Sequence, residues 1–320
     1  MTASVVSALR RVARDAAHSA AGPGCCRACE RGEAVLADRA DGVVVRHGDA
    51  VAKAHADGTD PAGHRARLAV AAHPRLAGIL LPPLPAAVDG VHGRPVTAWP
   101  YGTPVDPGDP DAAPWAEAGT LLARLHTVPL TALSGALPPM RGPAKAALAL
   151  GRMRAAGHHP AALPVRRAWE RLPAWARGED RPPGPVALCH GDLHLGQLVR
   201  HPAPDGPWQL IDVDDLGTGD PAWDLARPAA WYAAGLLDPG LWQRFLGAYR
   251  SAHGPAVPAV GDPWPRLDVA ARALTVQTAA LAVAKSAGAG RGLDEVEQLM
   301  VDACARIGAL ATESGPGASS

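Results

Sequence analysis

The sequence predicts an α+β fold with two lobes, a small antiparallel sheet followed by a mainly helical part. The chain has 320 residues, more than a single hydrophobic core usually holds. Three short segments near the N-terminus, residues 33–37, 42–47 and 50–55, are predicted strands, and Gly48-Asp49 forms a tight hairpin turn between the last two. Most of the remaining segments carry apolar residues at helical spacing.

The composition indicates a globular protein that acts on small molecules. Hydrophobic residues make up 48% of the chain and charged residues 19%, whereas a disordered chain would have fewer apolar residues and a stronger charge. The 31 basic residues balance the 31 acidic ones. This balance gives no electrostatic reason to expect nucleic acid or an anionic membrane as a partner.

The first predicted helix, residues 3–20, caps the N-terminal lobe and lacks the marks of a signal peptide. It contains Arg10, Arg11 and Arg14 and has no apolar core or cleavage site. No later run approaches the length of a membrane span. We therefore expect a cytoplasmic protein whose five cysteines stay reduced.

Three of these cysteines, Cys25, Cys26 and Cys29, follow the first helix closely. A Cys-x-x-Cys pair is half of a zinc site, but the sequence has no second pair. Free structural thiols are therefore favoured over a bound metal ion.

The later elements are predicted from apolar spacing and from their Pro and Gly boundaries. Strands are expected at residues 96–99, 185–188 and 208–211. Helices are expected at residues 61–76, 115–127, 145–157, 163–177, 223–235, 241–252, 266–287 and 293–312.

The stretch between residues 186 and 226 carries most of the chemistry. Two apolar strands each run into acids and amides: Asp192, His194 and Gln197 follow the first, and Asp212 ends the second. Two carboxylates at adjacent strand ends, with an amide between them, can hold a divalent cation and leave one carboxylate free for a substrate hydroxyl. The pattern is typical of an active site in a cleft.

Three blocks in this stretch resemble a known family. They are HGDLHLGQ at residues 190–197, ID at 211–212 and GDPAWDLA at 219–226. Together they closely resemble the aminoglycoside phosphotransferase (choline kinase-like) family, which shares the protein kinase fold. The resemblance implies a protein kinase-like fold with a nucleotide-binding lobe at residues 1–100 and a helical lobe at 101–313 that holds the catalytic loop and the acceptor site. Residues 314–320 are predicted to be a disordered tail.

The resemblance also implies roles for individual residues. Asp192 would orient the acceptor hydroxyl and accept its proton late in transfer, and Gln197 and Asp212 would ligate Mg²⁺. Lys53, in Val51-Ala52-Lys53-Ala54, resembles the third-strand lysine that contacts nucleotide phosphates. It interrupts an apolar strand in a chain that has only two other lysines, Lys145 and Lys285, which favours a functional role over a solvated surface side chain.

Residues 96–99 lead into Pro100-Tyr101-Gly102, which resembles the hinge between the lobes of the family. Ala98 and Trp99 are the candidates for contacts with adenine. Trp99 and Tyr101 are equally compatible with a packing role.

Two positions depart from the family pattern. The helix at residues 61–76 lacks the glutamate that usually pairs with the lysine, so the partner of Lys53 is expected elsewhere, at Asp57 or Asp60, or is absent. Gln197 stands where the family has asparagine. Its amide oxygen is still a suitable Mg²⁺ ligand.

The remaining polar residues of the stretch are predicted to support the site. His190 would brace the loop backbone, and Asp220 and Asp224 would tie the following helix to the catalytic loop. His126 is predicted to be structural. For Asp214 and Asp215 in the same stretch, the favoured interpretation is solvated turn acids; attraction of a cationic acceptor or of a second metal is the alternative.

The sequence therefore predicts an enzyme that transfers the γ-phosphate of ATP or GTP to a hydroxyl of a small molecule, such as an aminoglycoside, another antibiotic, an amino alcohol or a sugar. The alternative is a nucleotide-binding pseudokinase that acts as a regulatory or binding module. A protein kinase is disfavoured, because no Asp-Phe-Gly to Ala-Pro-Glu pattern is present.

Overall fold

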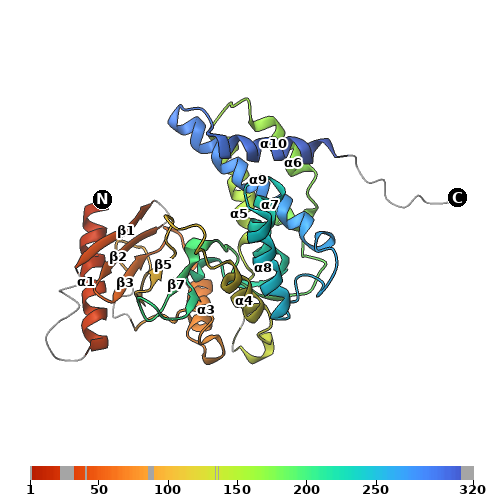
Figure 1. The fold of residues 1–320 in the computed structure, drawn as a ribbon. Coiled ribbons are helices and arrows are strands. Elements are labelled where there is room, and N and C mark those ends of the chain that lie inside the picture. Colours follow the sequence, from red (N-terminus) through yellow and green to blue (C-terminus); the bar gives the residue numbers. More distant parts are fainter. Residues whose placement is uncertain are drawn as a thin grey trace.

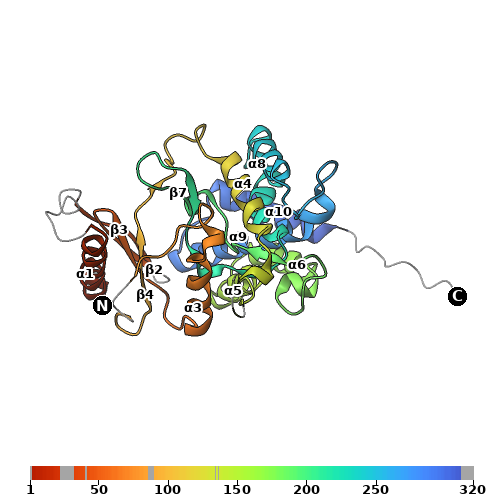
Figure 2. The same cartoon turned by 90° about the horizontal axis from the view of Figure 1, so that it is seen from below.

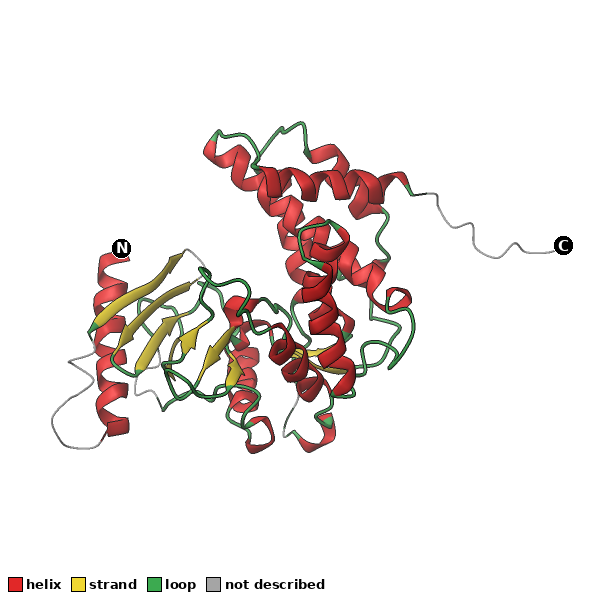
Figure 3. Ribbon diagram, in the orientation of Figure 1, coloured by secondary structure: helices red, strands yellow, loops and turns green. Residues whose placement is uncertain are grey.

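The N-terminal part of the molecule is a four-stranded antiparallel sheet. The computed structural model describes residues 2–21, 32–39, 42–85, 90–133, 135 and 137–310. The sheet has the order β1-β2-β3-β4, and its strands are among those drawn in yellow in Figure 3. Its strands are β1 (Glu33–Arg39), β2 (Gly42–His47), β3 (Ala50–Ala54) and β4 (Val96–Pro100).

Helix α1 (Thr2–Ala21) covers one face of this sheet, as predicted (Figure 1). Strands β2 and β3 alternate buried and half-buried residues, because successive side chains point to opposite faces. Gly48, at φ 56°, allows the tight turn between them. The apolar side of α1 and the inner side of the sheet form one small core that includes Val5, Leu9, Val43 and Val45.

Helix α3 (Pro61–Ala71) lies between the sheet and the helical part (Figure 2). The Asp60 side chain caps its first turn by accepting the N–H groups of Ala62 and Gly63. The helix ends at Ala71, five residues before the predicted end at residue 76, because Pro74 cannot donate to a continuing helix and begins the separate 3₁₀ turn η1 (Pro74–Leu76). Buried apolar side chains between Val70 and Leu80 pack into the core of the helical part. The proposed division of the chain at residue 100 stays a prediction.

Two smaller sheets hold the catalytic stretch. Strands β5 (Thr103–Pro104), β7 (Leu198–Arg200) and β8 (Trp208–Leu210) form one, and β6 (Ala187–Cys189) pairs with β9 (Gly217–Gly219) in the other. The loop of residues 190–197 thus leaves β6 and returns at β7, and Asp212 follows β8 closely. Strands β5, β7 and β9 have two or three residues each and were not predicted. Strands β6 and β8 are as short, but an apolar segment marks each of them in the sequence.

The rest of the structure is helical, which confirms the predicted α+β fold class (Figure 3). The helices are α4 (Trp115–His126), α5 (Gly142–Ala155), α6 (Ala162–Glu170), α7 (Ala222–Ala233), α8 (Pro239–Ser251), α9 (Trp264–Ala289) and α10 (Glu295–Ala309). Helix α4 packs on α8, and α9 packs on α5, α7 and α10.

The predicted helix at residues 163–177 is wrong in its second half. A break at Pro173 separates α6 from the 3₁₀ turn η3 (Ala174–Arg177).

Helix α9 is long and apolar enough to cross a membrane by length and composition alone. The expectation that no run approaches a membrane span is therefore wrong for this segment. In the fold, 61% of its most apolar window is buried, and buried side chains such as Leu267, Leu274 and Val283 belong to the main core. It has the environment of a central core helix.

Two sequence predictions fall outside the described residues. They concern the thiols of Cys25, Cys26 and Cys29 and the tail at residues 314–320. Cys189 and Cys304 are described, and both are buried free cysteines.

The close packing of α4 on α8 requires a glycine at residue 119. A Cβ there would lie 2.3 Å from the carbonyl oxygen of Phe245 and 3.1 Å from the amide nitrogen of Tyr249. We expect Gly119→Ala to lower the free energy of unfolding by about 1–3 kcal/mol, because the helices must separate. Gly247→Ala, on the exposed side of α8 with open space around it, should instead raise stability by about 0.5–1 kcal/mol. Urea denaturation of both variants checks this pair, and equal effects would contradict the packing account.

Candidate active site

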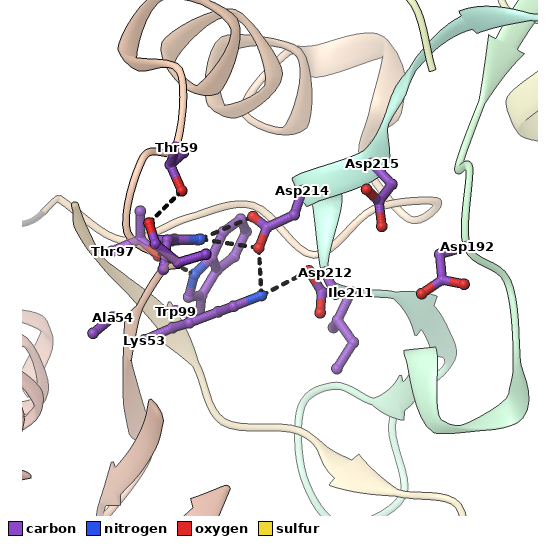
Figure 4. A network of polar contacts seen from close by, with 12 residues as sticks. Lys53, Ala54, Thr59, Thr97, Trp99, Asp192, Ile211, Asp212, Asp214 and Asp215 are labelled. Atoms are coloured by element: carbon purple, nitrogen blue, oxygen red, sulfur yellow. Dashed lines mark hydrogen bonds and ion pairs between the residues drawn. The ribbon is translucent and has the colours of Figure 1, made fainter. Parts of the chain in front are cut away.

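Lys53 on β3 forms ion pairs with two carboxylates of the helical part. Its Nζ lies 2.7 Å from Oδ1 of Asp212 and 2.9 Å from Oδ2 of Asp214 (Figure 4). Burial alone would lower the pKa of Lys53, but the two carboxylates outweigh it and raise the pKa above its usual value. The lysine is therefore a fixed positive charge at the junction of the two parts.

Asp214 is held in turn by a hydrogen-bonded chain that reaches the sheet. Nδ1 of His55 donates to Asp214, with 2.9 Å to Oδ1, and Nε2 of His55 accepts the hydroxyl of Thr97 at 2.7 Å. Thr97 Oγ1 accepts Nε1–H of Trp99 at 2.8 Å. With the protons placed in this way, each of the three hydrogen bonds has one donor and one acceptor. We call His55, Thr97 and Trp99 the relay.

Electrostatics around Asp214 favour its ionised form. Burial would raise the pKa of this carboxyl, but the hydrogen bond from His55 and the charge of Lys53 outweigh burial and hold the pKa well below its usual range. The favoured prediction of a solvated turn acid is therefore wrong for Asp214, because its partners come from β3 and the residue after it.

The expected partners of Lys53 were also wrong. Asp60 caps α3, and Asp57 is exposed and lies 3.8 Å from Nε of Arg94. Helix α3 contributes a different group at this place: the ring of His64 meets the ring of His55 edge to face, with 4.3 Å between centroids. Burial, followed by the neighbouring His55, lowers the pKa of His64 to about 4, so this imidazole is neutral at pH 7.

The catalytic loop is held by one buried carboxylate on α7. Asp224 accepts the backbone N–H of His190 at 2.6 Å on Oδ2 and that of Gly191 at 2.7 Å on Oδ1. Gly191 has φ 85°, and a Cβ there would lie 2.3 Å from the carbonyl oxygen of Asp215. Only glycine meets both demands. The predicted role of Asp224, tying the helix to the loop, is confirmed.

Two further groups complete this support. Nε2–H of His126 donates to Asp224 Oδ2 at 2.9 Å, and Nδ1 of His126 accepts the hydroxyl of Tyr249 at 2.8 Å. His190 donates from Nε2 to the carbonyl of Ile211 at 2.8 Å, which joins the loop to the residue before Asp212. His126 and His190 thus have the structural roles that the sequence predicted.

Asp192 is engaged by two cations. Oδ1 accepts Nη2 of Arg227 at 2.6 Å, and Oδ2 lies 2.7 Å from Nζ of Lys145. Burial would raise its pKa, but Lys145 and Arg227 outweigh burial and lower the pKa of Asp192 to about 2. The carboxylate is ionised at neutral pH, as a proton acceptor must be before transfer.

Asp215 shares Lys145 with Asp192. Lys145 Nζ lies 2.7 Å from Asp215 Oδ2, and Arg141 Nη1 lies 3.6 Å from Asp215 Oδ1. Burial raises the pKa of Asp215 in spite of these cations. Because the residue is buried and paired, the prediction of a solvated turn acid is wrong here too.

Gln197 and Asp212 are neighbours across β7 and β8. The N–H of Ile211 donates to the carbonyl of Gln197 at 2.9 Å, which places Asp212 next to the amide residue. Asp212 adopts a left-handed backbone with φ 63° and ψ 75°, a conformation that is uncommon outside glycine but that aspartate adopts more readily than most residues. Amide and carboxylate oxygens are hard donors of the kind Mg²⁺ prefers, so the two residues present fit this ion.

His194 on the same loop stays neutral at pH 7. Burial, and then the nearby charge of Arg227, lower its pKa to about 4. Its Nδ1 accepts the N–H of Gly196 at 3.1 Å. The positive charges beside Asp192 therefore come from Lys145 and Arg227, which sequence reasoning had not assigned.

The two candidate hinge residues lie on β4. Trp99 is packed into the main core and joins the relay, and the Ala98 carbonyl accepts the N–H of Leu84 at 2.8 Å. Both residues have structural contacts in place. Their contact with adenine stays a prediction.

Residues 36–264 match the model of a family described as the phosphotransferase enzyme family, over more than two thirds of the chain. The chain belongs to this family. The predicted resemblance and the predicted enzyme class, a small-molecule kinase, are thereby confirmed. No match to a curated protein sequence was found.

Solved structures of other phosphotransferases have the same fold. One is a choline/ethanolamine kinase family protein from Mesorhizobium loti, at TM-score 0.55 and 17% identity over 87% of this chain and 86% of that one. Another is a thermostable mutant of aminoglycoside phosphotransferase APH(4)-Ia, at TM-score 0.60 and 15% identity over 87% of this chain and 95% of that one. A third is spectinomycin phosphotransferase APH(9)-Ia with ADP and spectinomycin, at TM-score 0.53 and 12% identity over 86% of this chain and 88% of that one.

The relay should control how well this phosphotransferase uses nucleotide. Thr97→Val keeps the side-chain shape and removes the hydroxyl, so His55 loses the bond that fixes its ring and Asp214 holds Lys53 less firmly. We expect kcat/KM for nucleotide to fall about tenfold, the equivalent of one lost hydrogen bond of about 1.4 kcal/mol. Steady-state kinetics measures this change.

Thr59→Val is the matched control, because the Thr59 hydroxyl bonds only the nearby carbonyl of Ala56, at 2.7 Å. This variant should keep wild-type kcat/KM. Unchanged kinetics in a folded Thr97→Val protein would show that the relay does not act on the nucleotide site.

Proposed function

We propose that this phosphotransferase moves the γ-phosphate of ATP or GTP to a hydroxyl of a small molecule. The observation that carries the proposal is that Lys53, Asp212 and Asp192, from three separate segments, lie at one site (Figure 4). Phosphoryl transfer needs charge neutralisation, in-line positioning and a proton acceptor more than it needs covalent chemistry. These residues can meet those needs.

Lys53 is suited to the phosphate chain of the nucleotide. Its charge is fixed by Asp212 and Asp214, so it keeps its proton over the physiological pH range. Asp192, with its pKa lowered to about 2, would orient the acceptor hydroxyl and take up its proton as the oxygen bonds to phosphorus. Ala98 and Trp99 are proposed to lie beside the adenine.

Gln197 and Asp212 would hold Mg²⁺. The bound ion would neutralise charge on the nucleotide phosphates. The longer side chain of Gln197, compared with asparagine, suits a loop whose backbone is set farther from the ion.

The alternative function is a nucleotide-binding regulatory module. One observation favours it: both carboxylate oxygens of Asp192 are already bonded, to Lys145 and Arg227, so the acid must exchange a partner to reach a substrate. Magnesium-dependent nucleotide turnover by the purified protein distinguishes the two functions. We place the enzyme in the cytoplasm, where the buried free thiols of Cys189 and Cys304 would stay reduced.

Asp192→Asn tests the proton acceptor. We expect turnover to fall by on the order of a hundredfold or more while nucleotide affinity changes little, because the amide cannot accept the proton. Rapid-quench turnover and a separate nucleotide-binding titration measure the two effects. Asp205→Asn, an exposed loop acid, should leave both unchanged; wild-type turnover in Asp192→Asn would rule out the assigned role.

Gln197→Ala tests the magnesium ligand. We expect the Mg²⁺ concentration for half-maximal turnover to rise about tenfold or more, since even groups that only support metal ligands change affinity on that scale. Gln243→Ala, at an exposed position on α8, is the control. An unchanged magnesium requirement would mean that Asp212, the nucleotide and water hold the ion without Gln197.

A further inference from the structure

The acceptor side of Asp192 is lined by positive charge. Lys145 lies 2.7 Å from carboxylate oxygens of both Asp192 and Asp215, and Arg227 lies 2.6 Å from Asp192. Asp214 is paired with Lys53 and His55. The acids at the site are Asp192, Asp212, Asp214 and Asp215. Each of them already has a lysine, arginine or histidine partner within the protein.

Arg141 adds a cation whose side chain makes a long ion pair with Asp215 and no hydrogen bond to the described residues. Its backbone N–H is fixed to the carbonyl of Asp215 at 3.2 Å, directly before α5. Its side chain is 47% exposed, and its Nη1 lies 3.6 Å from Oδ1 of Asp215, within ion-pair distance but beyond hydrogen-bond distance. In the described parts of the chain no other acid pairs with it. Arg141 therefore holds a planar guanidinium, with several N–H donors, next to Asp215 and Lys145.

Helix α5 continues this surface away from the site. Leu148 and Arg152 follow Lys145 by three and seven residues and share its side of the helix. They belong to an open groove of about 690 Å³ between α5 and η3. The groove is lined by apolar residues, Arg152 and Arg177, and no acid lines it. The Arg177 guanidinium is already paired with Glu179.

We propose that the acceptor is a hydroxyl compound that also carries an anionic group, a carboxylate or a phosphate, bound by Arg141 beside Asp192. This inference rests on the proposed kinase function. A polycationic acceptor needs unpaired carboxylates, and the acids here are neutralised, whereas an anion finds Arg141 ready to donate two parallel hydrogen bonds.

The transfer step balances with this placement. The acceptor hydroxyl oxygen forms a bond to the γ-phosphorus, the bond from that phosphorus to the β,γ-bridging oxygen breaks, and the nucleoside diphosphate leaves with the electron pair. The hydroxyl proton passes to a carboxylate oxygen of Asp192. Arg141 takes no proton; it positions the acceptor by its anionic group.

The test compares acceptor classes with the purified full-length protein, Mg²⁺ and ATP or GTP. The panels are hydroxy acids, phosphorylated sugars, neutral sugars and nucleosides, and polycationic aminoglycosides, each read by the mass gain of one phosphate. We expect phosphorylation within the first two panels, and the preferred panel identifies the anionic group. Arg141→Ala should raise the KM of that acceptor by about tenfold or more, with a larger rise for Arg141→Glu, and leave the KM of the nucleotide unchanged.

Arg166→Ala, an exposed arginine on α6, is the control and should leave the acceptor KM unchanged. Phosphorylation of neutral or polycationic compounds without any anionic acceptor would overturn this inference and keep the kinase. An unaltered acceptor KM in both Arg141 variants would do the same. Absence of magnesium-dependent nucleotide turnover, with or without acceptors, would overturn the kinase function itself.

Discussion

The ion pairs of Lys53 with Asp212 and Asp214 are the interaction on which the rest of the site depends. They join β3 of the N-terminal sheet to the segment after β8; Lys53 and Asp212 are 159 positions apart in the sequence. A buried ammonium with two carboxylates is stabilising only when its geometry is fixed, since removing one partner leaves an uncompensated charge. The relay from Trp99 to His55 supplies that geometry from the sheet, and His64 on α3 supports it. The structure thus meets the need for an orienting acid without a glutamate on the helix.

A second buried acid, Asp224, gives the catalytic loop its shape. It uses its oxygens for two successive backbone N–H groups and for His126, so the loop stays in place without help from a substrate. Asp192 then extends into a cluster of alternating charges with Lys145, Arg227 and Asp215. The charges on both sides are therefore held in place by the protein, with Lys53 between two acids on one side and Lys145 and Arg227 around Asp192 on the other.

The sequence predicted the fold class and the segments that carry Lys53, Asp192, Gln197 and Asp212, because those residues stand in motifs with defined spacing. It did not predict the partners of Asp214 and Asp215. An acid in a short turn looks solvated until the strand that approaches it is known, and that strand lies far away in the chain. The role of Lys145 could have been predicted. The chain has only three lysines, and this scarcity, which favoured a functional role for Lys53, applies equally to Lys145. Strands of two or three residues, such as β5 and β9, have no period to detect.

The most direct test of the central claim is a double-mutant cycle between Lys53 and Asp214. The measurement is kcat/KM for nucleotide in Lys53→Met, Asp214→Asn and the double variant, with folding checked by thermal denaturation. If Asp214 acts by orienting Lys53, the double variant should be no worse than Lys53→Met alone, which is the signature of two residues that work through one interaction. Losses that multiply in the double variant would contradict the account and show that Asp214 acts on the nucleotide site independently of Lys53.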